Sequence, residues 1–192
     1  MNHTPQIKKA IQFAARKHHG QMRAETEPLP YVTHLFSVAL LVAESGAGDD
    51  VIAAALLHDT LEDTETTPEE LSAAFGPRVL ELVESVSEAK AEDGQKLPWK
   101  DRKEGYLATL AKAPDDALIV AMADKIDNIE SKLEGLEAGD EQLLQWFKDP
   151  EANFWYHGEV LKMGQERLPE HLLTKRLAEA CARERAKLAP AV

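Results

Sequence analysis

The chain has 192 residues, a length that suits one globular domain and is short for two. Hydrophobic residues make up 44% and charged residues 29% of it, which excludes a disordered chain and a disulfide-stapled miniprotein. With 34 acidic and 22 basic residues the net charge is −12, so bulk binding to nucleic acid or to an anionic membrane is disfavoured. A polyanionic substrate must therefore find a local basic pocket.

The single cysteine, Cys181, can neither pair within the chain nor build a thiolate metal cluster, which is typical of a reducing compartment. The N-terminal residues lack the charged region and apolar stretch of a signal peptide. No run approaches the ~20 apolar residues that a membrane helix needs. We therefore expect a cytoplasmic protein with neither a nucleic-acid nor a membrane partner.

Apolar residues in the first third of the chain recur at helical spacing, which predicts three amphipathic helices. Their apolar positions fall within residues 7–14, 35–42 and 51–55. Thr4 caps the first helix, with Pro5 at its first helical position. The second helix stops at Gly46, and Asp49 or Asp50 caps the third.

The rest of the chain also shows the helical period. Thr67 and Glu70 form a capping box that opens a short helix to Phe75, and Gly76 separates it from an apolar run over residues 79–86. A polar loop is expected over residues 89–97. Further helices are expected over residues 98–110, 115–136, 141–147, 153–168 and 169–188. Sustained alternation of period two is absent from the sequence, so the predicted fold class is all-α.

Side chains of metal-ligand type interrupt otherwise apolar helix faces. They are His34, His58, Asp59 and Asp124. On a helical wheel His58 falls over Val51, and Asp124 follows Val120 by one turn, so both point into the core. A carboxylate buried alone is costly or takes up a proton, whereas a divalent cation shared by two imidazoles and two carboxylates removes that penalty. Satisfied core histidines and capping acids explain any one of these residues better, but a shared cation explains the set.

Segments of the sequence around these residues resemble a known family. They are AARKHHGQMR (14–23), PYVTH (30–34), AALLHDTLEDT (54–64) and MADKIDNI (122–129). In order and spacing they are similar to the HD-domain metal-dependent phosphohydrolases, and within them to the hydrolase domain of the RelA/SpoT alarmone enzymes. The resemblance is clear over residues 6–133, and beyond them only residues 154–161 look familiar.

This resemblance implies a compact multi-helix HD-domain fold. We expect one domain over residues 1–192, with a motif core over about 6–133 and C-terminal helices over about 141–189. It further implies metal-dependent removal of the 3′-pyrophosphate from (p)ppGpp-type alarmones, which gives GDP or GTP and pyrophosphate. The chain ends before the synthetase and regulatory domains of the long family members, so a small stand-alone hydrolase is expected. Nitrogen and carboxylate ligands suit several divalent cations, and the family analogy favours Mn²⁺.

Glu62 and Asp63 lie four and five residues after His58. In the family this acidic pair marks the alarmone hydrolase branch. At that distance the pair can orient or deprotonate a metal-bound water without being a ligand. A solvated acidic turn is the alternative, and we prefer the catalytic interpretation because the four ligand candidates lie beside it.

The resemblance also assigns residues to the substrate. Arg23 matches an arginine that stacks on the purine, which suits a planar guanidinium. Asn128 and Ser131 match positions that contact ribose and 5′-phosphate groups, and Tyr156 is a further candidate. The other histidines are expected at the surface or in loops. They are His3, His18, His19, His157 and His171.

The chain departs from the family pattern at several points, which we expect beside the substrate pocket and outside the metal shell. They are Leu35 in place of a proline, extra residues between Arg23 and Tyr31, Asp127 in place of a histidine, and Glu130 in place of an arginine. These departures leave the substrate base and the number of 5′-phosphates open. Alternatives are an adenosine-based alarmone, the 2′-phosphate of NADPH, a nucleoside monophosphate, or a nucleotide sensor without turnover. The oligomeric state is also left open.

Overall fold

A computed structural model describes residues 4–23, 29–88, 97–139 and 149–188. The described part is helical, apart from one isolated antiparallel bridge between Met22 and Pro30. The all-α prediction is therefore confirmed. The helix expected over residues 141–147, most of the loop expected over 89–97, and His3 lie outside the described residues.

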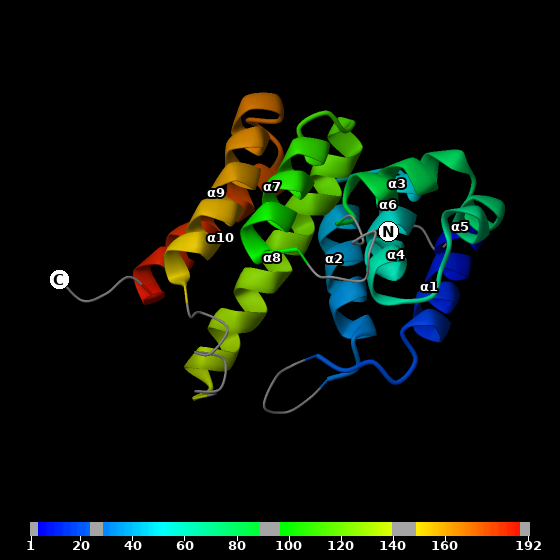
Figure 1. The fold of residues 1–192 in the computed structure, drawn as a ribbon, viewed down its shortest axis with the longest axis horizontal. Coiled ribbons are helices and arrows are strands. Elements are labelled where there is room, and N and C mark those ends of the chain that lie inside the picture. Colours follow the sequence, from blue (N-terminus) through cyan, green and yellow to red (C-terminus); the bar gives the residue numbers. More distant parts are fainter. Residues whose placement is uncertain (1–3, 24–28, 89–96, 140–148, 189–192) are drawn as a thin grey trace.

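Figure 1 shows the order of the helices along the chain. In chain order they are α1 (Pro5–Lys17), α2 (Val32–Glu44), α3 (Asp49–Leu57), α4 (Thr60–Asp63), α5 (Pro68–Phe75), α6 (Pro77–Ser85), α7 (Trp99–Leu110), α8 (Asp115–Glu137), α9 (Pro150–Arg167) and α10 (Leu172–Leu188).

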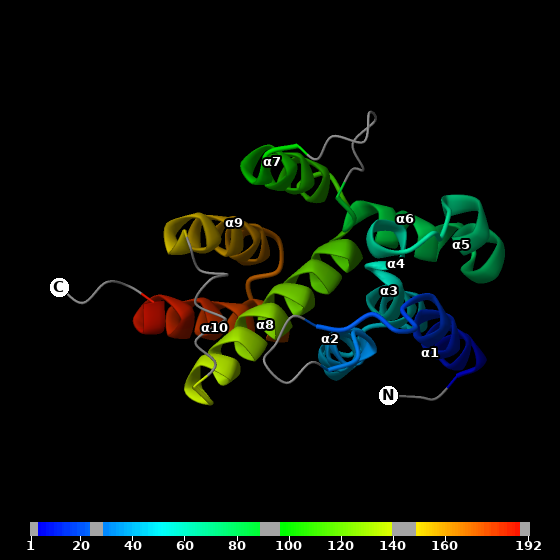
Figure 2. The same ribbon diagram turned by 60° about the horizontal axis from the view of Figure 1, so that its bottom comes forward.

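The long helix α8 runs between two groups of helices. In Figures 1 and 2 the helices α1 to α6 lie on one side of it, and α9 and α10 lie on the other. It packs against α2 and α3 on the first side and against α9 and α10 on the second. Side chains from both groups therefore meet along α8.

Burial explains why α3 and α8 occupy the centre. Every residue from Val51 to Leu57 is buried, so α3 is apolar on all faces and must be enclosed by other helices. In α8 the continuous buried run extends from Ala117 to Asp127. Three charged residues near its end, Asp124, Lys125 and Asp127, are therefore held inside the protein.

Several helix boundaries follow the predicted capping signals. Thr4 accepts a hydrogen bond from the Ile7 N–H at 3.4 Å, and Thr67 accepts one from the Glu70 N–H at 3.2 Å. The cap of α3 was predicted wrongly: Gly48 is its N-cap, and both aspartates lie in its first turn, where they favour the positive end of the helix. The described part contains no helix long and apolar enough to cross a membrane.

The last two helices begin elsewhere than predicted. Helix α9 starts at Pro150, because the Asp149 side chain caps it by accepting a hydrogen bond from the Ala152 N–H at 3.0 Å. Helix α10 starts only at Leu172. The Thr174 hydroxyl donates to the Leu168 carbonyl at 2.8 Å and stabilises the turn between the two helices.

Candidate active site

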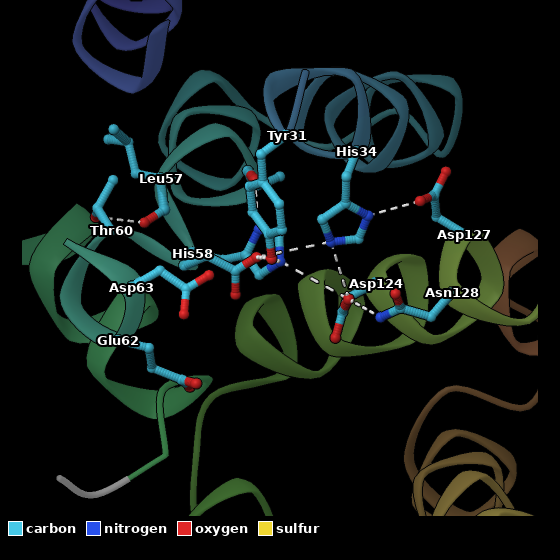
Figure 3. A network of polar contacts seen from close by, with 12 residues as sticks. Tyr31, His34, Leu57, His58, Thr60, Glu62, Asp63, Asp124, Asp127 and Asn128 are labelled. Atoms are coloured by element: carbon cyan, nitrogen blue, oxygen red, sulfur yellow. Dashed lines mark hydrogen bonds and ion pairs between the residues drawn. The ribbon is translucent and has the colours of Figure 1, made fainter. Parts of the chain in front are cut away.

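Three helices and one helix junction bring the predicted ligands together (Figure 3). His34 lies in the first turn of α2, and Asp124 lies in the middle of α8, which packs against α2. His58 ends α3, and Asp59 is the N-cap of the short helix α4. The break in the chain between α3 and α4 therefore turns two adjacent ligand candidates toward the same point.

The four ligand atoms converge. The His34 Nε2 lies 3.3 Å from the Asp124 Oδ1 and 3.7 Å from the Asp59 Oδ2. The His58 Nε2 lies 3.1 Å from the Asp59 Oδ2 and 3.7 Å from the Asp124 Oδ1. Ligand atoms held about 2.1 Å from one cation lie roughly 3 to 3.5 Å apart. The spacing thus suits a single divalent ion.

The imidazoles are oriented for metal binding. His58 Nδ1 donates to the Ala55 carbonyl at 2.8 Å, and His34 Nδ1 faces the Asp127 Oδ2 at 2.6 Å. Each ring therefore turns Nε2 toward the cluster, and the buried His58 Nε2 has no hydrogen-bond partner. A buried nitrogen without a partner is costly, and a cation would satisfy it. The ligand atoms of His34, His58 and Asp59 lie within 4.8 Å of one another.

Charge coupling sets the protonation of the cluster. Burial lowers the pKa of His58, but Asp59 and Asp124 outweigh burial and raise that pKa well above its ordinary value. Burial alone would raise the pKa of the Asp59 carboxyl, but the nearby His58 lowers that pKa below its ordinary value. In the same way Lys125 and the two imidazoles hold the pKa of Asp124 well below its usual range. A divalent cation would displace the imidazole protons, so metal affinity should fall at low pH.

Tyr31 supports the cluster from outside. Its hydroxyl donates to the Asp59 Oδ2 at 2.6 Å, and its ring stacks on His18 with 5.2 Å between ring centroids. His18 Nδ1 in turn contacts the Gln21 Oε1 at 2.7 Å. This chain of contacts ties the end of α1 to one of the ligand carboxylates.

Glu62 and Asp63 project from α4 beside the ligands but in different environments. Glu62 is partly buried and accepts a hydrogen bond from the Glu88 N–H. Burial is the main reason that the pKa of Glu62 rises to about 7. Asp63 is exposed, and its Oδ2 accepts a hydrogen bond from the Gln21 Nε2 at 3.0 Å. Glu62 thus has a pKa suited to proton transfer near neutral pH.

A cavity of about 140 Å³ opens from the cluster toward α7 and α9. Its lining also includes Lys103, Tyr106, Lys125 and Tyr156. The Lys103 Nζ lies 4.6 Å and the Lys125 Nζ 5.0 Å from the ring centroid of Tyr156. The hydroxyls of Tyr106 and Tyr156 are buried without hydrogen-bond partners. We call these four residues the cationic wall; two ammonium groups and two available hydroxyls are suited to bind phosphate oxygens.

The cationic wall is joined to the catalytic candidates. Lys103 and Arg102 both pair with the side-chain carboxylate of Glu88. The main-chain N–H of Glu88 donates a hydrogen bond to Glu62. Lys125 pairs with Asp124. Burial, and then the nearby charge of Lys125, lowers the pKa of Lys103.

Comparison with known proteins identifies the family. A model described as the HD domain matches residues 10–143. The chain belongs to the HD-domain family. The family resemblance drawn from the motifs is therefore confirmed.

Relatives of the HD domain include named hydrolases. Over 126 residues the chain is 41% identical to human guanosine-3′,5′-bis(diphosphate) 3′-pyrophosphohydrolase MESH1. The alignment covers 65% of this chain and 68% of that protein. Over 132 residues it is 39% identical to an Aquifex aeolicus guanosine-3′,5′-bis(diphosphate) 3′-pyrophosphohydrolase. That alignment covers 67% of this chain and only 18% of the longer Aquifex protein.

Solved HD-domain structures share the architecture. A metazoan ortholog of SpoT, described as hydrolysing ppGpp, superposes with a TM-score of 0.76 at 26% identity, over 95% of this chain and 97% of that one. The protein lmo0812 from Listeria monocytogenes EGD-e superposes with a TM-score of 0.69 at 27% identity, over 81% of this chain and 97% of that one.

Within this HD domain the predicted substrate residues lie at different places. Asn128 and Tyr156 line the cavity, and the Asn128 Nδ2 donates to the Asp124 Oδ1 at 2.5 Å. Arg23 lies outside the cavity lining and contacts the Asp127 Oδ2 at 3.3 Å. Ser131 is partly buried on α8 and is also absent from that lining.

The prediction that the remaining histidines lie at the surface or in loops is wrong for His157, which is buried within α9, whereas His18 is buried but lies in the turn after α1. His18 is 2% and His157 is 3% exposed. His18 is covered by Tyr31, and His157 on α9 faces the Glu184 Oε2 of α10 at 2.9 Å. Neither belongs to the metal cluster, whereas His19 is exposed and His171 is partly buried.

Three departures from the family pattern lie elsewhere than predicted, because none of them lines the cavity. Leu35 is fully buried in the core, so it fills space between helices. Asp127 contacts the ring of the ligand candidate His34 directly and thus belongs to the shell around the metal cluster. Glu130 lies 3.7 Å from the exposed Arg183 and forms a surface ion pair.

Sequence reasoning missed the cationic wall apart from Tyr156. Lys125 stands within a quoted motif, and its position beside an inward-facing Asp124 was a signal that it is buried. Lys103 and Tyr106 lie three residues apart on α7, so a shared helix face was also readable. What the sequence did not reveal is that this face turns toward the metal cluster.

Proposed function

We propose that the chain hydrolyses the 3′-pyrophosphate of (p)ppGpp-type alarmones to GDP or GTP and pyrophosphate. The observation that carries the proposal is the joint geometry around one small cavity: a convergent set of ligand candidates, Glu62 beside them, and the cationic wall in the same lining. The 41% identity to human MESH1 and the likeness to the metazoan SpoT ortholog support the same reaction.

In this proposal His34, His58, Asp59 and Asp124 hold one divalent cation, for which we favour Mn²⁺. Nitrogen and carboxylate ligands without thiolate suit that ion. When bound, the cation would polarise the phosphate group and lower the pKa of water. Tyr31 and Asp127 keep the carboxylate of Asp59 and the ring of His34 in place.

Glu62 and Asp63 are the proposed catalytic residues. Glu62, with a pKa of about 7, can accept a proton from the attacking water and return it to the leaving group. The Glu88 N–H fixes its carboxylate. Asp63 is held by Gln21, so it stays oriented beside the cluster.

The cluster suggests how a nucleotide lies across it. Glu62 and Asp127 lie on opposite sides of the cluster in Figure 3. Arg23 contacts Asp127, so the purine is proposed to stack on that side. Lys103 and Lys125 lie on the cavity side and are proposed to bind phosphate.

The other predicted substrate residues are assigned to the ribose and to the phosphate groups of the nucleotide. Asn128 borders both Asp124 and the cavity, and we assign it to the ribose. Tyr156 contributes a hydroxyl to the phosphate end. Ser131, one turn further along α8, is proposed to reach a 5′-phosphate.

The partner, the cellular location and the domain organisation are part of the same proposal. A purine nucleotide is the proposed partner, and the lone buried thiol of Cys181 supports a cytoplasmic location. A single domain over residues 1–192 is supported by the superposition on 95% of the chain.

Product analysis of the purified protein with Mn²⁺ tests the proposal. The nucleotide panel contains guanosine and adenosine 3′-pyrophosphates, NADPH and nucleoside monophosphates. We expect pyrophosphate release from a 3′-pyrophosphate substrate, abolished by a chelator and restored by Mn²⁺. If the protein releases phosphate only from NADPH or from a nucleoside monophosphate, that nucleotide is the substrate and the alarmone proposal is wrong. Metal and nucleotide binding without any product would make the protein a sensor.

A further inference from the structure

Asp127 connects two parts of the site that the proposed function treats separately. Its Oδ2 lies 2.6 Å from the His34 Nδ1 and 3.3 Å from the Arg23 NH1. The side chains of Asp127 and Arg23 are 9% and 13% exposed, so the contact is shielded from water. Figure 3 shows Asp127 on the side of His34 that faces away from the other ligand candidates. A single carboxylate oxygen therefore touches both a ligand imidazole and the proposed base-stacking arginine.

Comparison of the two imidazoles shows what this carboxylate adds. His58 directs its Nδ1 to the neutral main-chain carbonyl of Ala55, whereas His34 directs its Nδ1 to the charged carboxylate of Asp127. Both partners fix the ring orientation, but a carboxylate also makes the opposite nitrogen a better donor to a metal. The charge on Asp127 is therefore not needed to orient a ring, because a carbonyl does so at His58.

Position on α8 explains how Asp127 makes both contacts. It follows Asp124 by three residues, so the two carboxylates share a helix face and approach His34 at different nitrogens. Arg23 comes from the segment after α1 and is brought to α8 by this ion pair. A buried arginine–carboxylate pair holds its partners in a narrow range of positions.

We propose that Asp127 is a positioning residue that both strengthens His34 as a metal ligand and holds Arg23 at the base site. The base half of this inference rests on the proposed function, whereas the metal half rests on the cluster alone. The two contacts predict separable effects. Loss of the charge alone should release Arg23, and loss of every polar atom should also weaken the metal site.

Two substitutions separate the contacts. Asp127→Asn keeps a neutral oxygen for the His34 Nδ1–H, like the carbonyl at His58, but removes the charge that pairs with Arg23. Asp127→Leu keeps the volume and removes both contacts. Affinity for Mn²⁺, measured on the nucleotide-free protein by electron paramagnetic resonance, should fall only a few-fold in the first variant and about 10- to 100-fold in the second.

The Michaelis constant tests the contact with Arg23. Asp127→Asn should raise KM for the nucleotide substrate with a smaller change in kcat, because base stacking is present in the ground state and the transition state alike. In an Arg23→Ala background the same substitution should raise KM no further. In an Arg16→Ala background, which removes an exposed arginine near the end of α1, the full KM increase should remain.

Three results would overturn the inference. A folded Asp127→Leu protein that binds Mn²⁺ as tightly as the parent removes the role at His34. An undiminished KM effect in the Arg23→Ala background, or no KM effect at all, removes the role at Arg23. If Asp127→Leu does not fold, Asp127→Asn still tests both roles. Its effect on KM with and without Arg23 tests the role at Arg23, and a loss of Mn²⁺ affinity larger or smaller than a few-fold contradicts the role at His34. Failure of the proposed function is distinct, because the unsubstituted protein would then release no pyrophosphate.

Discussion

The candidate metal cluster and the cationic wall line one cavity but are built differently. The cluster comes from α2, α8 and the junction of α3 with α4, and outer partners orient its side chains: Tyr31 contacts Asp59, and Asp127 contacts His34. The wall comes from α7, α8 and α9, and two of its hydroxyls are buried without a hydrogen-bond partner. The cluster is thus suited to one divalent cation, while the wall offers polar groups that suit an anionic ligand.

Charge distinguishes the two regions as clearly as geometry does. The chain carries a net charge of −12, yet Lys103 and Lys125 face the cavity from a buried wall. Their ammonium groups lie over tyrosine rings, and each also pairs with a carboxylate, Lys103 with Glu88 and Lys125 with Asp124. In a site of low effective dielectric such charges act more strongly on phosphate than they would at the surface. We propose the wall as the local basic pocket that a polyanionic substrate requires.

The largest expected effect comes from breaking the cluster at Asp124. This carboxylate contacts both imidazoles, Lys125 and Asn128, so Asp124→Ala should abolish metal binding and turnover. It also leaves Lys125 buried without its partner, and breaking such a pair costs on the order of 3 kcal/mol of unfolding free energy. Metal content and chemical denaturation of the variant measure the two effects.

Asp116→Ala is the matched control for that variant. It removes an aspartate from the first turn of the same helix, where it pairs with the exposed Arg78. This control should keep full metal content and turnover. Full metal content in a folded Asp124→Ala protein would remove Asp124 from the ligand set.

The next effect concerns the acidic pair. Glu62→Gln and Asp63→Asn should each lower kcat by about 100-fold or more, since proton transfer by a positioned group contributes that much. Metal content should stay at the parental level, because neither residue contacts the convergent ligand atoms. Steady-state kinetics together with elemental analysis separate loss of chemistry from loss of metal.

Glu65→Gln provides the control for the acidic pair. Glu65 is exposed and lies two residues after Asp63, so it shares the local charge without facing the cluster. Its substitution should leave kcat unchanged. Near-normal rates in both Glu62→Gln and Asp63→Asn would show that Glu62 and Asp63 belong to a solvated acidic turn without a catalytic role.

A smaller effect is expected at the cationic wall. Lys103→Met keeps most of the side-chain volume and removes a charge, so KM should rise roughly 10- to 100-fold, as loss of a charge-assisted hydrogen bond predicts. Inhibition by pyrophosphate should weaken by a similar factor if Lys103 binds the departing group. Lys100→Met, one turn earlier and 71% exposed, should change neither constant. Equal constants in Lys103→Met and the parent would exclude Lys103 from substrate binding.

The same contrast explains which parts were predictable. The candidate ligand set could be proposed from the sequence because His58 and Asp59 are adjacent, and because polar side chains such as His58 and Asp124 interrupt otherwise apolar helix faces. The wall depends on packing between α7, α8 and α9, which periodicity within one helix does not specify. A buried lysine such as Lys125 also contradicts the general preference of lysine for the surface.

Long-range pairing accounts for the other errors. His157 is buried because Glu184 faces it from α10, and nothing in the sequence near His157 signals that partner. Asp127 was expected beside the pocket as a departure from the family pattern, although its spacing from Asp124 placed it on the same helix face. Helix existence was predicted well, since caps such as Thr4 and Thr67 are local, whereas contacts between helices were not.

The smallest effect is a pH dependence of stability caused by Glu62. The unfolded chain releases the Glu62 proton near its ordinary pKa of 4.5, whereas burial keeps the folded protein protonated up to about 7. Between these values the folded state binds more protons, so stability falls as pH rises from about 4.5 to 7 and the loss persists above 7. A shift of this size corresponds to about 3 kcal/mol. Glu62→Gln cannot ionise and should remove this loss.

The measurement is the difference in unfolding free energy between the parent and Glu62→Gln, taken in chelator at pH 5 and pH 8. Taking the difference cancels the titration of the imidazoles, which both proteins share. Glu62→Gln should be more stable than the parent at pH 8 by about 2 kcal/mol, with a smaller advantage at pH 5. Added Mn²⁺ should reduce that advantage, because a nearby cation favours the ionised carboxylate. An equal difference at both pH values would show that Glu62 titrates normally, and its burial would then not prepare it for proton transfer.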